Sequence, residues 1–230
     1  MALVKYGPFA QLSGSINGWV YSHNRSGAYV RNRSLVTNPN TAFQVEARGN
    51  FRDAVDAWTN NLDDTSRGEW ETYAANTPVL NRLGDPILLT GQQMFIRSYQ
   101  AIAMVGGDAP TGAPAIFDLG TFTPPVITAD ASAGELSVAF TNSDEWATAD
   151  GGFLSIKQSR PLNPTINFFR GPWRFVGSVA GAVIAPASPA VIDALFLPLT
   201  AGQKLFFEVR AINADFRVTS VSTVSTIVVA

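Results

Sequence analysis

The segment GSINGWVYSHNRSGAYVRNRSLVTNPNTAFQVEAR, residues 14–48, contains the change from strand to helix around which the chain is organised. Its first part has two strand-forming stretches, 15–22 and 28–33, separated by a turn over 23–27 in which Gly27 can adopt a positive φ. Its last part, from Thr41, has the pattern of an amphipathic helix. The segment therefore predicts a β-hairpin followed by a helix.

The hairpin belongs to a basic arm, residues 1–37. Residues 1–40 contain four Lys or Arg and no Asp or Glu, whereas residues 41–117 contain nine acidic and five basic residues. An isolated hairpin buries too little apolar surface to offset the entropy of ordering its chain. We therefore expect the arm to dock on a neighbour, either within one chain or in another copy.

The composition limits the possible classes of protein. A chain of 230 residues with 46% hydrophobic and 15% charged residues can bury sizeable cores, and the lack of cysteine excludes disulfides, thiolate nucleophiles and Cys-ligated zinc. The first residues lack the apolar run of a signal peptide. The apolar stretch 175–198 contains Pro186, Pro189 and Asp193, so we expect no transmembrane segment.

Three capping-box patterns predict a helical region over residues 38–105. They begin at Thr41, Ser66 and Thr90, each followed three residues later by Glu or Gln. The first predicted helix has an apolar stripe at helical spacing, and its members are Phe43, Ala47, Phe51, Ala54, Val55, Trp58 and Leu62. Together the three helices would form a small core with the aromatic residues Trp58, Trp70, Phe95 and Tyr99.

The composition then changes to that of a β domain. A Pro- and Gly-rich linker, residues 106–122, precedes short strand-like runs in residues 123–230. These runs are 136–140, 153–157, 175–176, 182–184, 204–212 and 218–229. We therefore expect an α+β protein in two parts: a β-hairpin arm with a small three-helix region, then an all-β sandwich.

The run LTAGQKLFFEVRAIN, residues 199–213, resembles the late strands of a fibronectin type III or related immunoglobulin-like domain. In that family a Leu-x-x-Gly turn enters a strand that ends in a Val-Arg-Ala-type run. The resemblance covers residues 123–230, with Phe140 and Leu205 at positions where the family usually has Trp and Tyr. It implies a sandwich of the immunoglobulin-like, or fibronectin type III-like, class.

The front half resembles small proteins encoded by tailed bacteriophages. They combine a Gly-Ser-x-x-Gly hairpin, an Asn-Pro-x-Thr helix start and a Leu-Thr-Gly-x-Gln-x-Phe helix, which match residues 14–18, 38–44 and 89–95. The resemblance implies a virion structural component: a head-decoration or minor capsid protein, or a tail accessory protein. Its partners would be other virion structural proteins and further copies of itself, and it would be made in the host cytoplasm.

No combination of residues predicts catalysis, a metal or a cofactor. His23 is the only histidine, and no nucleophile or carboxylate is placed near it in the sequence as a catalytic partner. The pairs Asp63-Asp64 and Asp144-Glu145 lack the spacing of a calcium loop, and adjacent acids point to different sides of a helix or strand. We therefore expect a non-enzymatic protein without a cofactor.

One constellation on the arm predicts partner binding. It consists of three arginines interleaved with three aromatic residues: Trp19, Tyr21, Arg25, Tyr29, Arg31 and Arg33. Arg, Trp and Tyr are enriched at protein–protein hot spots, whereas few cations are present for binding nucleic acid at physiological salt. We therefore expect a protein partner and regard nucleic acid as the weaker hypothesis.

The sandwich provides an alternative function. Trp146 and Trp173, with Phe168 and Phe169, could form an exposed platform that binds a glycan or a host-surface receptor. Buried aromatic residues are the commoner case in such sandwiches, so core positions are the competing interpretation. The alternative hypothesis is therefore an adhesion module that acts through its C-terminal domain.

Overall fold

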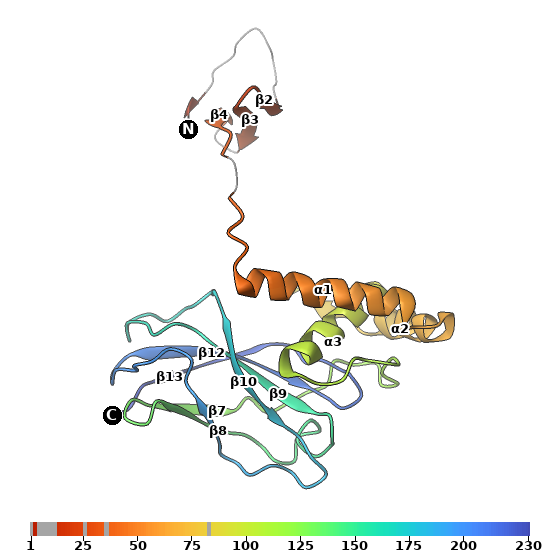
Figure 1. Ribbon diagram of the computed structural model, residues 1–230, viewed down its shortest axis with the longest axis vertical. Helices are drawn as coiled ribbons and strands as arrows, with labels where there is room; N and C mark the ends of the chain where they lie inside the picture. The colour runs from red at the N-terminus through yellow and green to blue at the C-terminus, as the bar shows by residue number, and fades with distance from the viewer. Residues whose placement is uncertain (1, 4–12, 25–26, 35–36, 82–83) are drawn as a thin grey trace. The chain divides into compact units, whose positions relative to one another are not determined.

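A computed structural model describes residues 2–3, 13–24, 27–34, 37–81 and 84–230 (Figure 1). The chain divides into two compact units, Met1–Val45 and Glu46–Ala230. The protein is α+β, as predicted: a hairpin-based sheet comes first, then three helices, then an all-β sandwich. The division falls within the first turn of the first helix, and each unit is described separately below.

The first unit is a small antiparallel sheet with the strand order β1-β4-β3-β2. Its strands are β1 (Ala2–Leu3), β2 (Gly14–Ile16), β3 (Trp19–Asn24) and β4 (Gly27–Asn32). The stretch predicted as one strand over 15–22 is in fact two, because Asn17 and Gly18 form a tight turn at φ values of 44° and 85°. Asn-Gly is the preferred pair for a two-residue hairpin in which both residues have positive φ.

The helices of the chain are α1 (Ala42–Asn60), α2 (Asp64–Asn76) and α3 (Gly91–Val105). Thr90 forms the predicted capping box with Gln93, and α3 ends at Gly106 in the left-handed conformation. The capping box predicted at Ser66 is wrong, because α2 begins earlier and Asp63 caps it by accepting from the Ser66 amide. A two-stranded hairpin of β5 (Val79–Leu80) and β6 (Pro86–Ile87) lies between α2 and α3.

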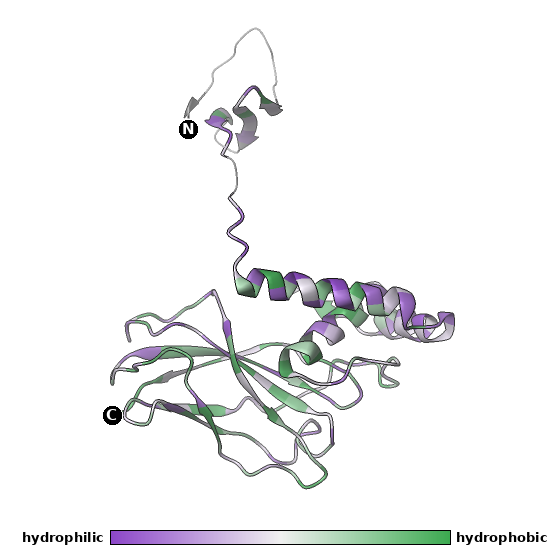
Figure 2. Ribbon diagram, viewed as in Figure 1, coloured by the Kyte–Doolittle hydropathy of each residue, from purple (hydrophilic) through white to green (hydrophobic). Residues whose placement is uncertain are grey.

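The helices enclose the predicted aromatic core. Phe95 lies 5.5 Å from both Trp58 and Trp70, and 5.9 Å from Tyr99, between ring centroids. Of the predicted apolar stripe, Ala54 and Leu62 are buried, and α1 also buries Ala57, which was not predicted as part of the stripe. Phe51 and Phe43, in the first half, are exposed, and Figure 2 shows apolar and polar residues along the length of α1.

Residues 126–227 form two sheets packed face to face. One has the order β11-β8-β7 and the other β10-β9-β12-β13, with a shared apolar core that includes Trp146, Leu154, Ile156 and Phe207. The bounds are β7 (Val126–Asp130), β8 (Glu135–Ala139), β9 (Phe153–Gln158), β10 (Arg174–Ala180), β11 (Ala190–Asp193), β12 (Lys204–Ile212) and β13 (Ser222–Ile227). The fourth strand, β10, lies at the edge of the four-stranded sheet, whereas constant-type immunoglobulin domains place their fourth strand in the opposite sheet.

Most of the predicted strands are present, and β12 has the predicted bounds. Residues 182–184 are not a strand; Val183 and Ile184 are exposed in the loop after β10. Two strands of the sandwich were not predicted, β7 and β11. Both lie at the edges of the three-stranded sheet and show outward-facing apolar residues, Val126 and Val191, in place of a clean polar alternation.

The helical region and the sandwich belong to one compact unit. Helix α3 lies against the outer face of the four-stranded sheet (Figure 1), where Ala101 and Ile102 pack with Ile212 and Val218. The hydroxyl of Ser98 also donates to the carbonyl of Phe216 at 2.9 Å. These contacts fix α3 on the sandwich, at the end of β12.

Candidate functional site

The register of the arm sheet divides the predicted partner-binding residues between its two faces. Trp19 is opposite Asn32 and Tyr21 is opposite Val30, so these two aromatic residues share one face. Tyr29 and Arg31 alternate with Val30 and therefore lie on the other face. Arg25 lies outside the described residues. The sheet thus presents an aromatic face and a mixed face with an arginine.

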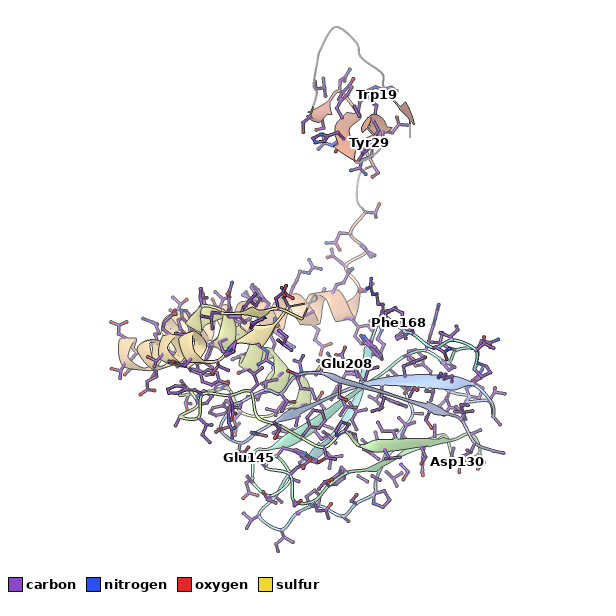
Figure 3. All side chains as sticks on the ribbon, turned by 180° about the vertical axis from the view of Figure 1, so that it is seen from behind. Trp19, Tyr29, Asp130, Glu145, Phe168 and Glu208 are labelled. Atoms are coloured by element: carbon purple, nitrogen blue, oxygen red, sulfur yellow. The ribbon has the colours of Figure 1, made fainter. Side chains whose placement is uncertain are left out.

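The aromatic face is incompletely covered. Trp19 is 49% exposed and its cross-strand neighbour Ile16 is 59% exposed, whereas Val30 is buried. Figure 3 shows Trp19 and Tyr29 in the first unit. Adjacent exposed Trp and Ile side chains on so small a sheet are typical of a surface that contacts another protein.

The basic residues of the arm have no acid within residues 1–40 to neutralise them. Arg31 and Arg33 are exposed, and the backbone amide of Arg33 donates to the carbonyl of Gly18 at 2.7 Å. This backbone hydrogen bond continues the pairing beyond the end of β4 and holds the backbone of Arg33 in place. Both guanidiniums are therefore available to carboxylates outside the arm.

The sandwich tryptophans do not form the predicted glycan platform. Trp146 is fully buried in the core with its ring 5.1 Å from that of Phe140, so its assignment as an exposed binding residue is wrong. Trp173 is half-buried and packs edge-on against Phe169 at 4.9 Å. Phe168, which also belongs to the predicted platform, is 67% exposed, with the Arg170 guanidinium 5.6 Å from its ring centroid.

A cluster of charged residues around Arg217 was missed by the sequence analysis. Arg217 is 3% exposed and bonds to three carboxylates: Asp118 at 2.6 Å, Asp215 at 2.6 Å, and Glu145. Glu145 also accepts from the Asn213 amide at 2.8 Å. No local spacing could have revealed this cluster, because its members come from separate segments of the chain.

The electrostatics of this cluster favour its ionised state. The hydrogen bond from Arg217, and then the Gly120 amide, lower the pKa of Asp118. Burial alone would lower the pKa of Arg217, but its bonds to Asp118 and Asp215 raise it. The Tyr73 hydroxyl donates to the Asp118 carbonyl at 2.7 Å, and burial raises the pKa of Tyr73 to about 12. The cluster therefore joins α2, residues 106–122 and the sandwich.

Within the described residues, no group of three or more His, Asp or Glu side chains is arranged to hold a metal ion. The described part of the chain also contains no helix with the length and apolarity needed to cross a bilayer. His23 is exposed on the aromatic face of the arm sheet, opposite Ala28.

No protein-family model matches the chain, and no match was found among curated proteins.

Proposed function

We propose that this protein is a non-enzymatic structural component of a tailed-bacteriophage particle, anchored to neighbouring virion subunits through its N-terminal arm and helices. The observation that carries the proposal is the arm itself. It is a compact unit with an exposed Trp19 and Ile16 on one face and exposed arginines that no arm residue neutralises. The similarity of residues 14–18, 38–44 and 89–95 to phage-encoded proteins supplies the class of particle.

The chemistry of the arm supports binding to an acidic protein surface. Trp19 and Tyr21 supply contact area with few rotatable bonds, and Arg31 and Arg33 supply guanidiniums that pair with carboxylates in a bidentate manner. Residues 41–117 carry four more acidic than basic residues, so another copy of this chain is one suitable partner. Several weak contacts of this kind would be strengthened by avidity in a multi-copy particle.

The second hypothesis, an adhesion module, has less support. Its platform combined Trp146 and Trp173, and Trp146 is a core residue. The sandwich would instead be the part that the anchored protein displays. Immunoglobulin-like sandwiches have many functions, so its fold alone does not specify a ligand.

The proposal is tested by measuring the mass of the chain in solution by sedimentation, with and without residues 1–35. We expect a defined oligomer for the full chain and a monomer for the truncated chain, in which the sandwich remains folded. The double variant Arg31→Glu, Arg33→Glu should weaken association at least about tenfold, because it replaces two hot-spot cations with like charges. Arg160→Glu, an exposed arginine of the sandwich, is the matched control.

A second readout addresses other virion proteins as partners. Full-length chain and truncated chain are each mixed with purified phage particles that lack the protein, and the bound fraction is measured after sedimentation. We expect binding of the full chain only. Equal binding by the truncated chain, or monomers in solution combined with no binding to particles, would contradict an anchoring role for the arm.

A further inference from the structure

A row of polar side chains crosses the outer face of the four-stranded sheet, next to α3. Ser155 of β9 is opposite Ser178 of β10 on one side and Arg210 of β12 on the other. All three point away from the core, because their flanking residues are core members: Leu154, Ile156, Val179, Val209 and Ala211. The row therefore places two hydroxyls and a guanidinium on one face of the sheet, where Ser155 is 2% exposed and Ser178 and Arg210 are partly buried.

Helix α3 adds a second guanidinium to this row. Nη2 of Arg97 donates to the carbonyl of Thr219 at 3.2 Å, and Thr219 bonds in turn to Ala211, the neighbour of Arg210. Nη1 of Arg97 is buried and has no hydrogen-bond partner among the described residues. A buried guanidinium nitrogen without an acceptor is unfavourable, so this atom needs an oxygen that the described residues do not supply.

The charges around the row do not balance. Glu208 is the nearest acid along β12, and it is already paired with Lys157 at 2.9 Å. The side chain of Arg210 makes no hydrogen bond or ion pair with a described residue, and α3 contains no charged residue besides Arg97. Figure 3 shows Glu208 on the side of the sandwich that faces the helices. The positive charges of Arg97 and Arg210 thus remain unbalanced, because Lys157 and Glu208 neutralise each other.

The two arginines also influence one another. Burial, and then the charge of Arg210, lower the pKa of Arg97 to about 10. Burial lowers the pKa of Arg210 as well, and Glu208 opposes that shift. With a pKa of about 10, Arg97 is charged at neutral pH. The repulsion between the partly buried guanidiniums of Arg97 and Arg210 therefore persists at neutral pH unless an anion neutralises it.

We propose that this row, Arg97, Arg210, Ser155 and Ser178, is a binding site for an oxyanion. Guanidiniums and hydroxyls are all donors to anionic oxygens, and the planar fork of Arg suits phosphate and carboxylate alike. The ligand accepts from Nη1 of Arg97 and from the Arg210 guanidinium, and the two serine hydroxyls complete its shell. This site is separate from the arm and does not depend on the proposed function.

The test is isothermal titration calorimetry of the full-length protein at neutral pH and fixed ionic strength in chloride. Inorganic phosphate is the first probe, and acetate, in a separate titration, distinguishes a phosphate site from a carboxylate site. We expect one saturable site per chain for at least one probe. Arg210→Gln should weaken binding at least tenfold, and Arg160→Gln, an exposed arginine outside the row, should leave it unchanged.

Two further variants make the result decisive. Arg97→Gln should weaken binding as strongly as Arg210→Gln, and Ser178→Ala should weaken it by a smaller factor, since it removes one neutral donor. If Arg97→Gln does not fold, Arg210→Gln and Ser178→Ala decide the matter, because both side chains are only partly buried. No saturable binding of either probe, or unchanged binding in Arg210→Gln, would overturn the proposal.

Discussion

Arg217 joins three segments of the second unit through one side chain. Its guanidinium is buried, while its partners Asp118, Glu145 and Asp215 are 58%, 50% and 34% exposed in their side chains. The carboxylates can therefore be hydrated again if Arg217 is removed, whereas the guanidinium has no other acceptors available to it. This asymmetry makes the arginine the residue on which the cluster depends.

We predict that Arg217→Met destabilises the protein by about 2 kcal/mol at pH 7, as expected for the loss of a partly buried ion-pair network. Arg217→Lys should also be destabilising, since an ammonium group cannot reproduce the planar fork that reaches three carboxylates. Urea denaturation of each variant measures the change in the free energy of unfolding.

The effect of Arg217→Met depends on pH. The pKa of Asp118 is lowered below its ordinary value of 3.8 in the folded protein, so its contribution is present above that value. It is lost as the pH falls through the folded-state pKa. The difference between wild type and Arg217→Met should therefore shrink from pH 7 to pH 3. A difference that stays constant over this range would mean that packing, and not the ion pairs, explains the loss.

At the scale of elements, sequence patterns succeeded where the determining contacts are local. The Thr90–Gln93 capping box and the glycine at the end of α3 involve residues a few positions apart, and both are present. The start of α2 was misplaced because Ser66 has the capping-box spacing, while Asp63 also satisfies the first turn. Local patterns are compatible with a helix start at either Asp63 or Ser66, and α2 begins after Asp63, which gives the longer helix.

The missed elements have a different cause. The edge strands β7 and β11 gain stability from pairing with β8, which is a tertiary contact, and their own alternation is weak. The turn at Asn17-Gly18 was available from the sequence, because Asn-Gly between apolar residues is a strong hairpin signal. Reading residues 15–22 as one strand with an interrupting glycine concealed it.

The cap of α3 gives a prediction at this scale. Thr90→Ala removes the acceptor for the Gln93 amide and should destabilise the protein by about 1 kcal/mol in urea denaturation. Thr72→Ala is the matched control, since Thr72 is exposed inside α2 and its hydroxyl bonds only to the carbonyl one turn earlier. Its effect should lie within about 0.5 kcal/mol of zero. Equal losses in the two variants would contradict a specific role for the cap.

For the molecule as a whole, residue type indicates a partner-binding surface on the arm, which stays a prediction, but it does not indicate the charged sites of the second unit. Trp19, Arg31 and Arg33 were identified because exposed arginines and aromatic residues on a short hairpin are informative by themselves. Arg217 meets Asp118 across 99 positions and Glu145 across 72. Arg97 likewise meets Thr219 across 122 positions. Such separations are set by topology, and no spacing in the sequence encodes them.

The same long-range contacts predict that the helical region and the sandwich unfold together. Apolar packing of α3 on β12, the Ser98 bond and the Arg217 cluster all connect the two regions. We expect Ile156→Ala, a core truncation in the sandwich, to lower the opening free energy of α3 amides by about 2–5 kcal/mol, the same amount as for β12 amides. Hydrogen exchange measured by mass spectrometry compares the two segments within one sample.

Val183→Ala is the matched control for this experiment. Val183 is 76% exposed, so losing its two methyl groups should leave the exchange of both segments unchanged. If Ile156→Ala instead accelerates exchange in β12 and leaves α3 at the wild-type rate, then the helices have a stability of their own. The sandwich would in that case be an appended domain, and the contacts around Arg217 and Ser98 would be too weak to couple the two.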